Sequence, residues 1–256
     1  MEQRPIIQAC NLEKEFRIRM HRGSLKAFVL SGGKLQTQIV HALRGLDLSI
    51  YPGESVALVG RNGSGKSTFL SLVARIYRPS SGTLEVNGQV APLLELGAGF
   101  HIDLTGRENA ELNGVILGLT RQEVAERLDA MVDFAELHEF FDAPLRTYSS
   151  GMVLRLGFAI AVNTKADILV VDEALAVGDE EFQEKCFAKI EELKSAGKTI
   201  LFVSHEMTDV TRTATRAIWM EHGKVRLDGE PHAVVEEYLR DAHHETQERV
   251  THSNWY

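Results

Sequence analysis

Residues 55–67 read SVALVGRNGSGKS, an apolar segment that runs into a glycine-rich turn closed by a lysine and a serine. The turn fits the pattern G-x-x-x-x-G-K-[S/T], and the segment 67–76 that follows has the apolar spacing of a helix. Strand, turn and helix in this order predict a loop that holds phosphate groups, because its N–H groups and the positive helix end face the anion. The alternative is a glycine-rich turn with an incidental lysine.

Each residue type in the turn serves this chemistry. Glycines let the backbone bend tightly and approach an anion closely. Lys66 is expected to reach the terminal phosphates, and the Ser67 hydroxyl is expected to be a ligand of Mg²⁺. The expected nucleotide-binding residues here are Gly60, Asn62, Gly63, Ser64, Gly65, Lys66, Ser67 and Thr68.

The rest of the chain alternates short apolar segments with helical patterns, which indicates an α/β fold. Strands are expected at 55–60, 83–86, 168–171, 199–203 and 217–220, and helices at 67–76, 122–137, 152–162 and 180–194. The strands at 168–171 and 199–203 are apolar throughout, as is typical of strands buried on both faces of a parallel sheet. Residues 97–161 have little strand character, so a helical insertion is predicted there. The segment 17–40 is irregular and contains a Gly-Gly pair, so a loop-rich insertion is predicted.

A second motif, ILVVDE at 168–173, is an apolar strand that ends in two acids. Buried parallel strands deliver the residues at their carboxyl ends to the ligand crevice. Asp172 suits Mg²⁺ binding through water, and Glu173 suits orienting or deprotonating an attacking water. A solvated acidic turn is the alternative.

A third polar position follows the strand expected at 199–203. There His205 lies in the sequence VSHEM. A histidine placed at the carboxyl end of a strand could hydrogen-bond either the terminal phosphate or Glu173. A purely structural histidine is the alternative.

Composition excludes several classes of protein. The 256 residues carry a net charge of −8, which disfavours general nucleic-acid binding. No segment approaches the roughly 18 apolar residues of a membrane-spanning helix, and the N-terminus lacks the apolar core of a signal peptide. If the protein serves a membrane, a different chain is expected to cross it.

Together these motifs resemble the ATP-binding cassette (ABC) ATPases, a branch of the P-loop NTPases. The segment YSSGM at 148–152 stands where that family has its L-S-G-G-Q signature, and it departs at three of five positions. The resemblance covers about residues 6–238. It implies a RecA-like parallel-sheet core, an N-terminal antiparallel β region and a helical subdomain. It also implies that Ser149, Ser150 and Gly151 reach the nucleotide of a second copy.

Three segments are similar to the ATPases of bacterial surface-polysaccharide exporters. They are YSSGM, DEALAVGD at 172–179 and LELGAGFHIDLTGREN at 94–109. The resemblance implies that Glu95 replaces the glutamine that usually contacts Mg²⁺, and that Asp179 faces the dimer. It places an adenine-stacking aromatic upstream of the phosphate loop, and Phe16 fits by position better than Phe28. A core role for Phe16 is the alternative.

The resemblance defines the expected assembly. The cofactors are ATP and Mg²⁺, and the partners are a second copy of this chain and an integral membrane permease, expected in two copies. The cargo is a lipid-linked polysaccharide such as O-antigen, and the site of action is the cytoplasmic face of the bacterial inner membrane. The expected domains are a nucleotide-binding domain at 1–240, with its helical subdomain at about 97–161, and a polar tail at 241–256. A C-terminal glycan-binding domain is not expected.

Three rival functions remain open. The ATPase could serve an importer or a drug exporter, it could act on nucleic acid or ribosomes, or it could be a regulator without turnover. The acidic composition and the single phosphate loop argue against the second, and Glu173 and His205 argue against the third.

The basic segment 17–44 has two interpretations. From residue 17 to 46 there are six Lys or Arg and no acidic residue. The segment either contacts anionic lipid heads or the transporter's cytoplasmic face, or it is a solvated loop.

Overall fold

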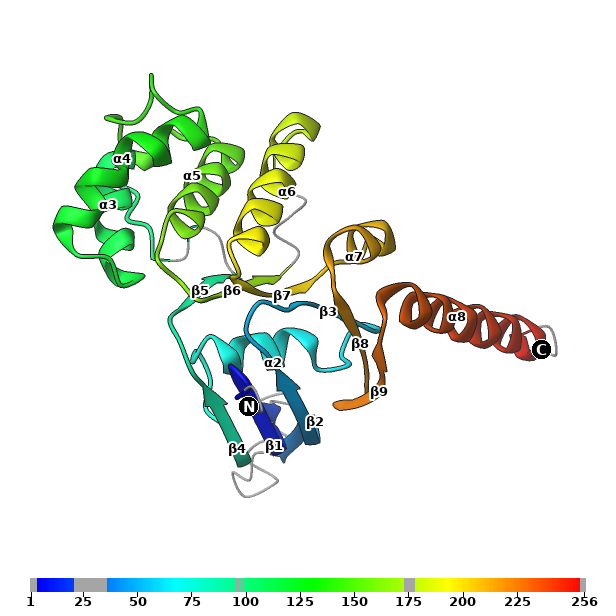
Figure 1. Ribbon diagram of the computed structural model, residues 1–256. Helices are drawn as coiled ribbons and strands as arrows, with labels where there is room; N and C mark the ends of the chain where they lie inside the picture. Colours follow the sequence, from blue (N-terminus) through cyan, green and yellow to red (C-terminus); the bar gives the residue numbers. More distant parts are fainter. Residues whose placement is uncertain (1–3, 21–35, 95–96, 98, 173–177, 254–256) are drawn as a thin grey trace, which may run out of the picture.

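The computed structural model describes residues 4–20, 36–94, 97, 99–172 and 178–253. Figure 1 shows two sheets, a group of helices beside them and a long C-terminal helix that projects away. The strands are β1 (Ile7–Met20), β2 (Gln36–Ile50), β3 (Ser55–Val59), β4 (Ser81–Val86), β5 (Val90–Leu93), β6 (Ile168–Asp172), β7 (Thr199–Val203), β8 (Arg216–Glu221) and β9 (Lys224–Gly229). The helices are α2 (Lys66–Val73), α3 (Gly106–Ile116), α4 (Arg121–Ala135), α5 (Ser150–Val162), α6 (Glu180–Ser195), α7 (Met207–Thr213) and α8 (Pro231–Ser253), with a 3₁₀ turn η1 (Leu145–Thr147).

The larger sheet has the strand order β5-β6-β7-β3-β8-β9. Its first five strands are parallel, and β9 is antiparallel to β8. Along β3, Ala57 and Val59 belong to the core on one face, whereas Val56 and Leu58 belong to the core on the other. Helix α2 packs on one face and helices α5 and α6 on the other (Figure 1). This burial on both faces is why the central strands are apolar at every position, and it confirms the predicted α/β fold.

The smaller sheet, β2-β1-β4, is antiparallel. Strands β1 and β2 stay paired from Ile7 and Ile50 out to Met20 and Gln36. The prediction of a loop-rich insertion at 17–40 is therefore wrong for both of its ends, which form a two-stranded ribbon. Ile18 and Ile39 on this ribbon are 47% and 48% exposed, so no buried face imposes the apolar alternation by which strands are recognised. Residues 21–35 lie outside the described residues.

Helices α3, α4 and α5 follow β5 and precede β6, in the part of the chain where a helical insertion is predicted. They share a core of their own, which includes Val124, Met131 and Ile160. Helices α3 and α4 each begin with a threonine whose hydroxyl accepts the N–H of a glutamate three residues on, while the glutamate carboxylate accepts the threonine N–H. These capping boxes fix where the helices start.

One ion pair ties α4 to the segment between α5 and β6. The Lys165 ammonium pairs with the Glu123 carboxylate, which also accepts the N–H of Thr120. These bonds, with that from Lys165 first, lower the pKa of Glu123 from 4.5 to about 2. Because the folded pKa is depressed, the pair stabilises the fold above pH 4.5 and loses this contribution as the pH falls towards 2.

We expect Glu123→Gln to unfold at a lower urea concentration than the wild type at neutral pH. Glutamine retains the cap at the start of α4, so the loss reports the ion pair, and it is small because the Lys165 side chain is 55% exposed. The difference should shrink as the pH falls from 4.5 towards 2. In a Lys165→Gln background the same substitution should show a weaker pH dependence, because only the bonds from Thr120 then lower the pKa of Glu123. A difference that is equal at neutral and acidic pH would contradict the ion pair.

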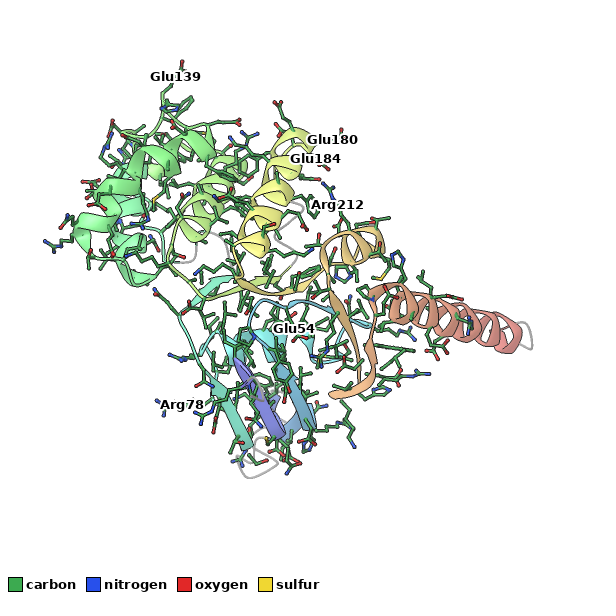
Figure 2. All side chains as sticks on the ribbon, viewed as in Figure 1. Glu54, Arg78, Glu139, Glu180, Glu184 and Arg212 are labelled. Carbon is green, nitrogen blue, oxygen red and sulfur yellow. The ribbon has the colours of Figure 1, made fainter. Side chains whose placement is uncertain are left out.

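Helix α6 is fixed to α7 by a bidentate ion pair. Both guanidinium nitrogens of Arg212 lie 2.9 Å from the Glu184 carboxylate oxygens. The guanidinium carbon also stands 4.6 Å from the ring centre of Phe187. Figure 2 shows Glu184 on α6 with Arg212 next to it.

The polar tail predicted from residue 241 belongs to helix α8, which runs without a break to Ser253. The Arg226 guanidinium lies over the Trp219 ring at 4.0 Å and donates to the Asp241 carboxylate at 2.6 Å. Trp219 also packs edge-on against Tyr238 at 5.5 Å. These contacts fix α8 to β8 and β9 as far as Asp241.

None of the helices in the described ranges combines the length and the apolar character that a bilayer crossing requires.

Candidate functional site

Three of the sequence motifs meet at the carboxyl edge of the larger sheet. In its register Leu58 pairs with Val203, and Val203 pairs with Asp172, so the three residues form a row across β3, β7 and β6. The glycine-rich loop follows β3, His205 follows β7, and Asp172 ends β6. Because parallel strands end at one edge, residues more than 100 positions apart are brought together.

The loop after β3 needs glycine at defined positions. Gly60, Gly63 and Gly65 have φ values of 139°, 81° and 106°, all in the region that other residues rarely adopt. A Cβ at Gly60 would lie 2.2 Å from the Met220 carbonyl oxygen, and one at Gly65 would lie 2.7 Å from the Ala42 carbonyl oxygen. At Gly63 no atom lies within 4 Å of an added Cβ. One side of the loop thus packs closely against neighbouring backbone, and the other side is open.

We expect Gly60→Ala to destabilise the protein by about 3 kcal/mol, through backbone strain and collision with Met220. For a chain of this size the thermal midpoint should fall by about 10 °C. The matched control is Gly229→Ala, where the new Cβ would meet the Val234 Cγ2 at 3.9 Å and φ is not positive. If a thermal scan gave the same unfolding midpoint for the two variants, the predicted strain and collision at Gly60 would be contradicted.

The open side of the loop forms a hollow of about 210 Å³, lined by residues 62–68. Helix α2 begins at Lys66 beside this hollow, and its N-cap residue, Gly65, provides no side-chain cap. The first N–H groups of a helix have no acceptor within the helix. Uncapped N–H groups at the positive end of a helix form an anion site, so the geometry suits a phosphate group.

Lys66 is buried, with a relative exposure of 7%. Its Nζ donates to the Gly60 carbonyl oxygen at 2.6 Å and to the Arg61 carbonyl oxygen at 3.0 Å. The ammonium is therefore held over the loop itself, at the place where the predicted phosphates would sit.

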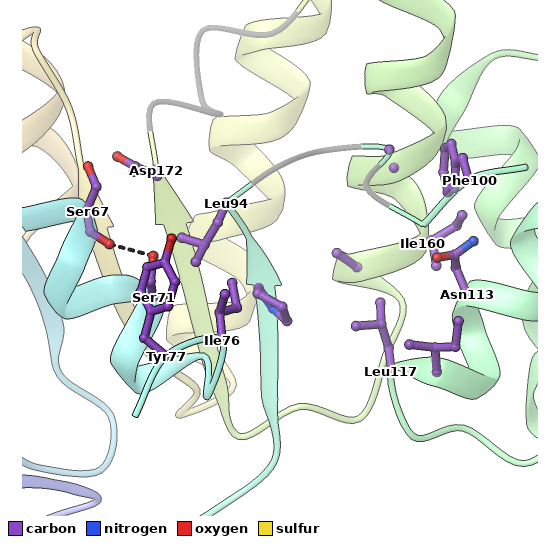
Figure 3. A pocket seen from close by; sticks show the side chains of 15 residues that line it. Ser67, Ser71, Ile76, Tyr77, Leu94, Phe100, Asn113, Leu117, Ile160 and Asp172 are labelled. Atoms are coloured by element: carbon purple, nitrogen blue, oxygen red, sulfur yellow. Dashed lines mark hydrogen bonds between the residues drawn. The ribbon is translucent and has the colours of Figure 1, made fainter. Parts of the chain in front are cut away.

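A larger cavity of about 360 Å³ adjoins the start of α2 and includes both Ser67 and Asp172 among its lining residues. Figure 3 shows these two side chains at one end of the cavity, with Ile160 and Leu117 of the helical part at the other. A hydroxyl and a carboxylate are oxygen ligands of the type that Mg²⁺ prefers, so the residues present fit that ion. Glu95, the third predicted ligand, lies outside the described residues.

The segment after β7 is held by a buried serine. Ser204 is 8% exposed, its hydroxyl donates to the Asp209 carboxylate at 3.1 Å, and its Oγ accepts the N–H of Glu206 at 3.1 Å. Burial raises the pKa of Asp209. This anchoring of the turn by Ser204 and Asp209 leaves His205 exposed at the sheet edge. Asp209 belongs to no sequence motif and was not predicted. Glu173, the predicted catalytic carboxylate, lies outside the described residues.

Phe16 lies on β1, half-buried, with its ring edge-on to Tyr77 at 5.3 Å. The Lys14 ammonium stands 5.1 Å from the Phe16 ring centre and 5.3 Å from that of Tyr77. Tyr77, which follows α2, lines the same cavity as Ser67 and was not among the predicted site residues. Phe28 lies outside the described residues, so the choice of adenine-stacking ring stays a prediction.

The signature-like segment opens helix α5. Ser149 is the N-cap, its Oγ accepts the N–H of Met152 at 3.2 Å, and the Met152 sulfur accepts the N–H of Ser149 at 3.5 Å. The Tyr148 hydroxyl donates to the Phe140 carbonyl at 2.7 Å, and burial raises the pKa of Tyr148 to about 12. A Cβ at Gly106 would lie 2.1 Å from that hydroxyl. The departures from the usual signature therefore leave the helix start well ordered.

This helix start lies outside the lining of the two cavities described above. Gly157 of α5 lines the cavity next to Ser67, whereas Ser149, Ser150 and Gly151 line neither cavity. Ser149 precedes Gly157 by eight positions, which is about 12 Å along a helix axis.

Asp179 caps α6, with its Oδ1 accepting the N–H of Phe182 at 3.0 Å.

The fold and the loop geometry define a P-loop nucleotide-binding protein. Residues 43–176 match the protein family described as ABC transporter. The chain therefore belongs to the ABC transporter family, as an ATPase.

Similar curated proteins are ATP-binding proteins of export systems. The chain is 49% identical to the O-antigen export system ATP-binding protein RfbB of Myxococcus xanthus, over 88% of its own length and 53% of that protein. It is 45% identical to the RfbB protein of Klebsiella pneumoniae, over 91% of its own length and 97% of that protein. With the teichoic acids export ATP-binding protein TagH of Enterococcus faecalis the identity is 39%, over 95% of this chain and 54% of that protein.

Solved structures support the fold. A dimeric ATP-binding cassette in a post-hydrolysis state, bound to ADP and phosphate, superposes with a TM-score of 0.71 at 21% identity. The match covers 88% of this chain and 98% of that one.

Proposed function

We propose that this chain is the ATP-hydrolysing subunit of an ABC exporter that moves a lipid-linked polysaccharide, O-antigen or a similar surface glycan, across a bacterial inner membrane. The observation that carries the ATPase assignment is the convergence of the loop at 60–67 with Asp172 on adjoining cavities. The names of the relatives, which belong to O-antigen and teichoic acid export systems, support the cargo. The subunit acts at the cytoplasmic face of that membrane.

Different residues bind the phosphates, neutralise their charge and activate the attacking water. The N–H groups of the loop and of the first turn of α2 bind the phosphates, and Lys66 neutralises their charge. Glu173 orients or deprotonates the attacking water, and His205 holds the terminal phosphate or Glu173 itself. Phosphoryl transfer depends mainly on positioning and charge stabilisation, and rigid strand ends provide the positioning.

A bound Mg²⁺ would neutralise charge that develops on the phosphates. Ser67 and Asp172 would hold it from their shared cavity, with Glu95 as the third ligand in our proposal. A carboxylate at residue 95 would add negative charge where the family usually has a neutral glutamine.

The functional unit is a pair of these chains. Ser149 and Gly151 stand at an anion-binding helix start that lines neither of the two cavities beside the phosphate loop, so in our proposal they complete the site of the second copy. Asp179 faces the same interface. ATP favours the closed pair because it bonds both faces only there. Closure moves the permease, in two copies, and hydrolysis releases it.

Deletion of the gene tests the proposal. Lipid-linked glycan should accumulate inside the cell and surface glycan should be lost. The wild-type gene should restore export, whereas a gene encoding Lys66→Ala should not. Normal surface glycan together with loss of another solute's transport would assign the ATPase to a different cargo. Absence of phosphate release by the chain purified with its permease would refute turnover itself.

A further inference from the structure

An arginine on α5 joins the two elements that the proposed function places at the dimer interface. Arg155 donates from one guanidinium nitrogen to the Glu136 carboxylate at 2.9 Å and from the other to the Asp179 carboxylate at 2.8 Å. Its guanidinium carbon stands 4.6 Å from the ring centre of Phe182, which is 1% exposed. The Arg155 side chain itself is 19% exposed, so three contacts fix it in a largely covered position.

The carboxylate of Glu136 is itself held in place. Glu136 ends α4 in the left-handed conformation, with φ 59°. Its second oxygen accepts from the Lys185 ammonium of α6 at 2.7 Å. The hydrogen bond from Lys185, and then the charges of Lys185 and Arg155, lower the pKa of Glu136. The anchor for Arg155 is therefore an ionised carboxylate tied to both α4 and α6.

Asp179 uses both of its carboxylate oxygens. Oδ1 caps α6 by accepting the N–H of Phe182, and Oδ2 accepts from Arg155. A carboxylate with both oxygens bound cannot rotate without losing one bond. Arg155 therefore sets the orientation of Asp179, and it does so from the helix that Ser149 begins.

We propose that Arg155 is a positioning residue for ATP hydrolysis, which locks the Ser149–Gly151 helix start and the Asp179 cap into one rigid face for the second copy. The inference rests on the proposed function, in which both elements meet the partner's nucleotide. In addition, the helix start and the Asp179 cap are already aligned within each subunit before the two copies meet. This alignment reduces the conformational entropy that is lost when the dimer closes.

The chemistry of the contact requires arginine. A planar guanidinium binds two carboxylates and stacks on a ring at the same time, whereas an ammonium acts as a point charge. Arg155→Lys keeps the positive charge and much of the side-chain length. It loses the planar group that binds two carboxylates at once and stacks on the ring. The substitution therefore tests the alignment of the two elements without changing the net charge.

The test uses the full-length chain. We expect Arg155→Lys to bind MgATP as a monomer with an affinity within about twofold of the wild type, because Arg155 lines neither nucleotide cavity. ATP-driven dimerisation, followed by light scattering, should weaken, and kcat should fall by about tenfold to a hundredfold. A change in kcat and dimerisation without a change in nucleotide affinity is not expected of a merely structural residue.

Arg212→Lys is the matched control. Arg212 also binds a glutamate in bidentate fashion and stacks on a phenylalanine of α6, but it does not contact Asp179. We expect this control to keep the wild-type kcat and to lose a similar amount of thermal stability. Glu136→Gln, which weakens the anchor and keeps Arg155, should give an intermediate kcat and serves if Arg155→Lys fails to fold.

The outcomes separate the two proposals. If the wild type neither dimerises with ATP nor hydrolyses it, the proposed function fails. If the wild type does both and Arg155→Lys and Glu136→Gln match the Arg212→Lys control, the positioning role of Arg155 is refuted. In an Asp179→Asn background Arg155→Lys should have little further effect on kcat. A full additional loss there would also overturn the inference.

Discussion

Replacing Lys66 with alanine should lower the affinity for MgATP by at least about thirtyfold, since truncating one partner of a buried charge pair costs about 2–5 kcal/mol. The ammonium is buried at the phosphate loop, where the dielectric constant is low and its attraction to phosphate is strong. Its removal also takes a donor from the Gly60 and Arg61 carbonyls. The loop thus loses the positive charge that attracts phosphate. It also loses the two hydrogen bonds that hold its own backbone.

Titration with a fluorescent ATP analogue in the presence of Mg²⁺ measures this loss. Lys189→Ala is the control, because Lys189 pairs with Glu192 on the outside of α6 and should leave the affinity unchanged. Thermal scans of both variants show whether the fold is intact. If Lys66→Ala binds the analogue as tightly as the wild type, Lys66 has no part in the nucleotide site.

Glu173→Gln should lower the rate of phosphate release by about 10²- to 10⁴-fold, which is the usual contribution of a general base. Glutamine has nearly the same shape but accepts no proton from water, so MgATP binding should persist. Because hydrolysis is what opens the proposed dimer, the variant should accumulate as a closed pair with ATP.

Single-turnover phosphate release and size-exclusion chromatography with MgATP check both parts. Glu184→Gln, on the outer surface of α6 (Figure 2), is the control and should keep normal turnover. Near-normal hydrolysis by Glu173→Gln would remove this residue from the catalytic role and would leave His205 as the remaining candidate.

Much of the fold was predictable because its central strands have an unambiguous pattern. The expected strand at 199–203 is β7 with identical limits, and the expected helix at 180–194 differs from α6 by one residue. Both patterns follow from burial: a strand covered on both faces is apolar throughout, and α6 buries one stripe. The capping threonines of α3 and α4 likewise follow from local hydrogen bonding.

The ribbon formed by β1 and β2 beyond Phe16 was not predictable in this way. Its exposed positions carry Arg17, Ile18, Gln38 and Ile39 without a buried face. Pairing with a strand some 20 residues away, and not local pattern, makes it a strand. Helix α8 was not among the predicted helices, and the Arg226 bond to Asp241 that fixes it links positions that no local pattern connects.

For the candidate site, the sequence identified the motifs but not their neighbours. Asp209 under Ser204 and Tyr77 beside Phe16 carry no motif, and only their contacts reveal them. The roles of Glu95 and Glu173 stay predictions, since both lie outside the described residues.

The sequence by itself determined the phosphate loop, because glycine conformations, a strand end and a helix start are local properties of a dozen consecutive residues. Tertiary structure alone decided which distant groups meet. The order of β6, β7 and β3 in the sheet placed Asp172 and His205 at the same edge as the loop, and the packing of α5 on α6 gave Arg155 its bond to Asp179. Such contacts depend on how separate elements pack, and neighbouring residues do not encode that packing.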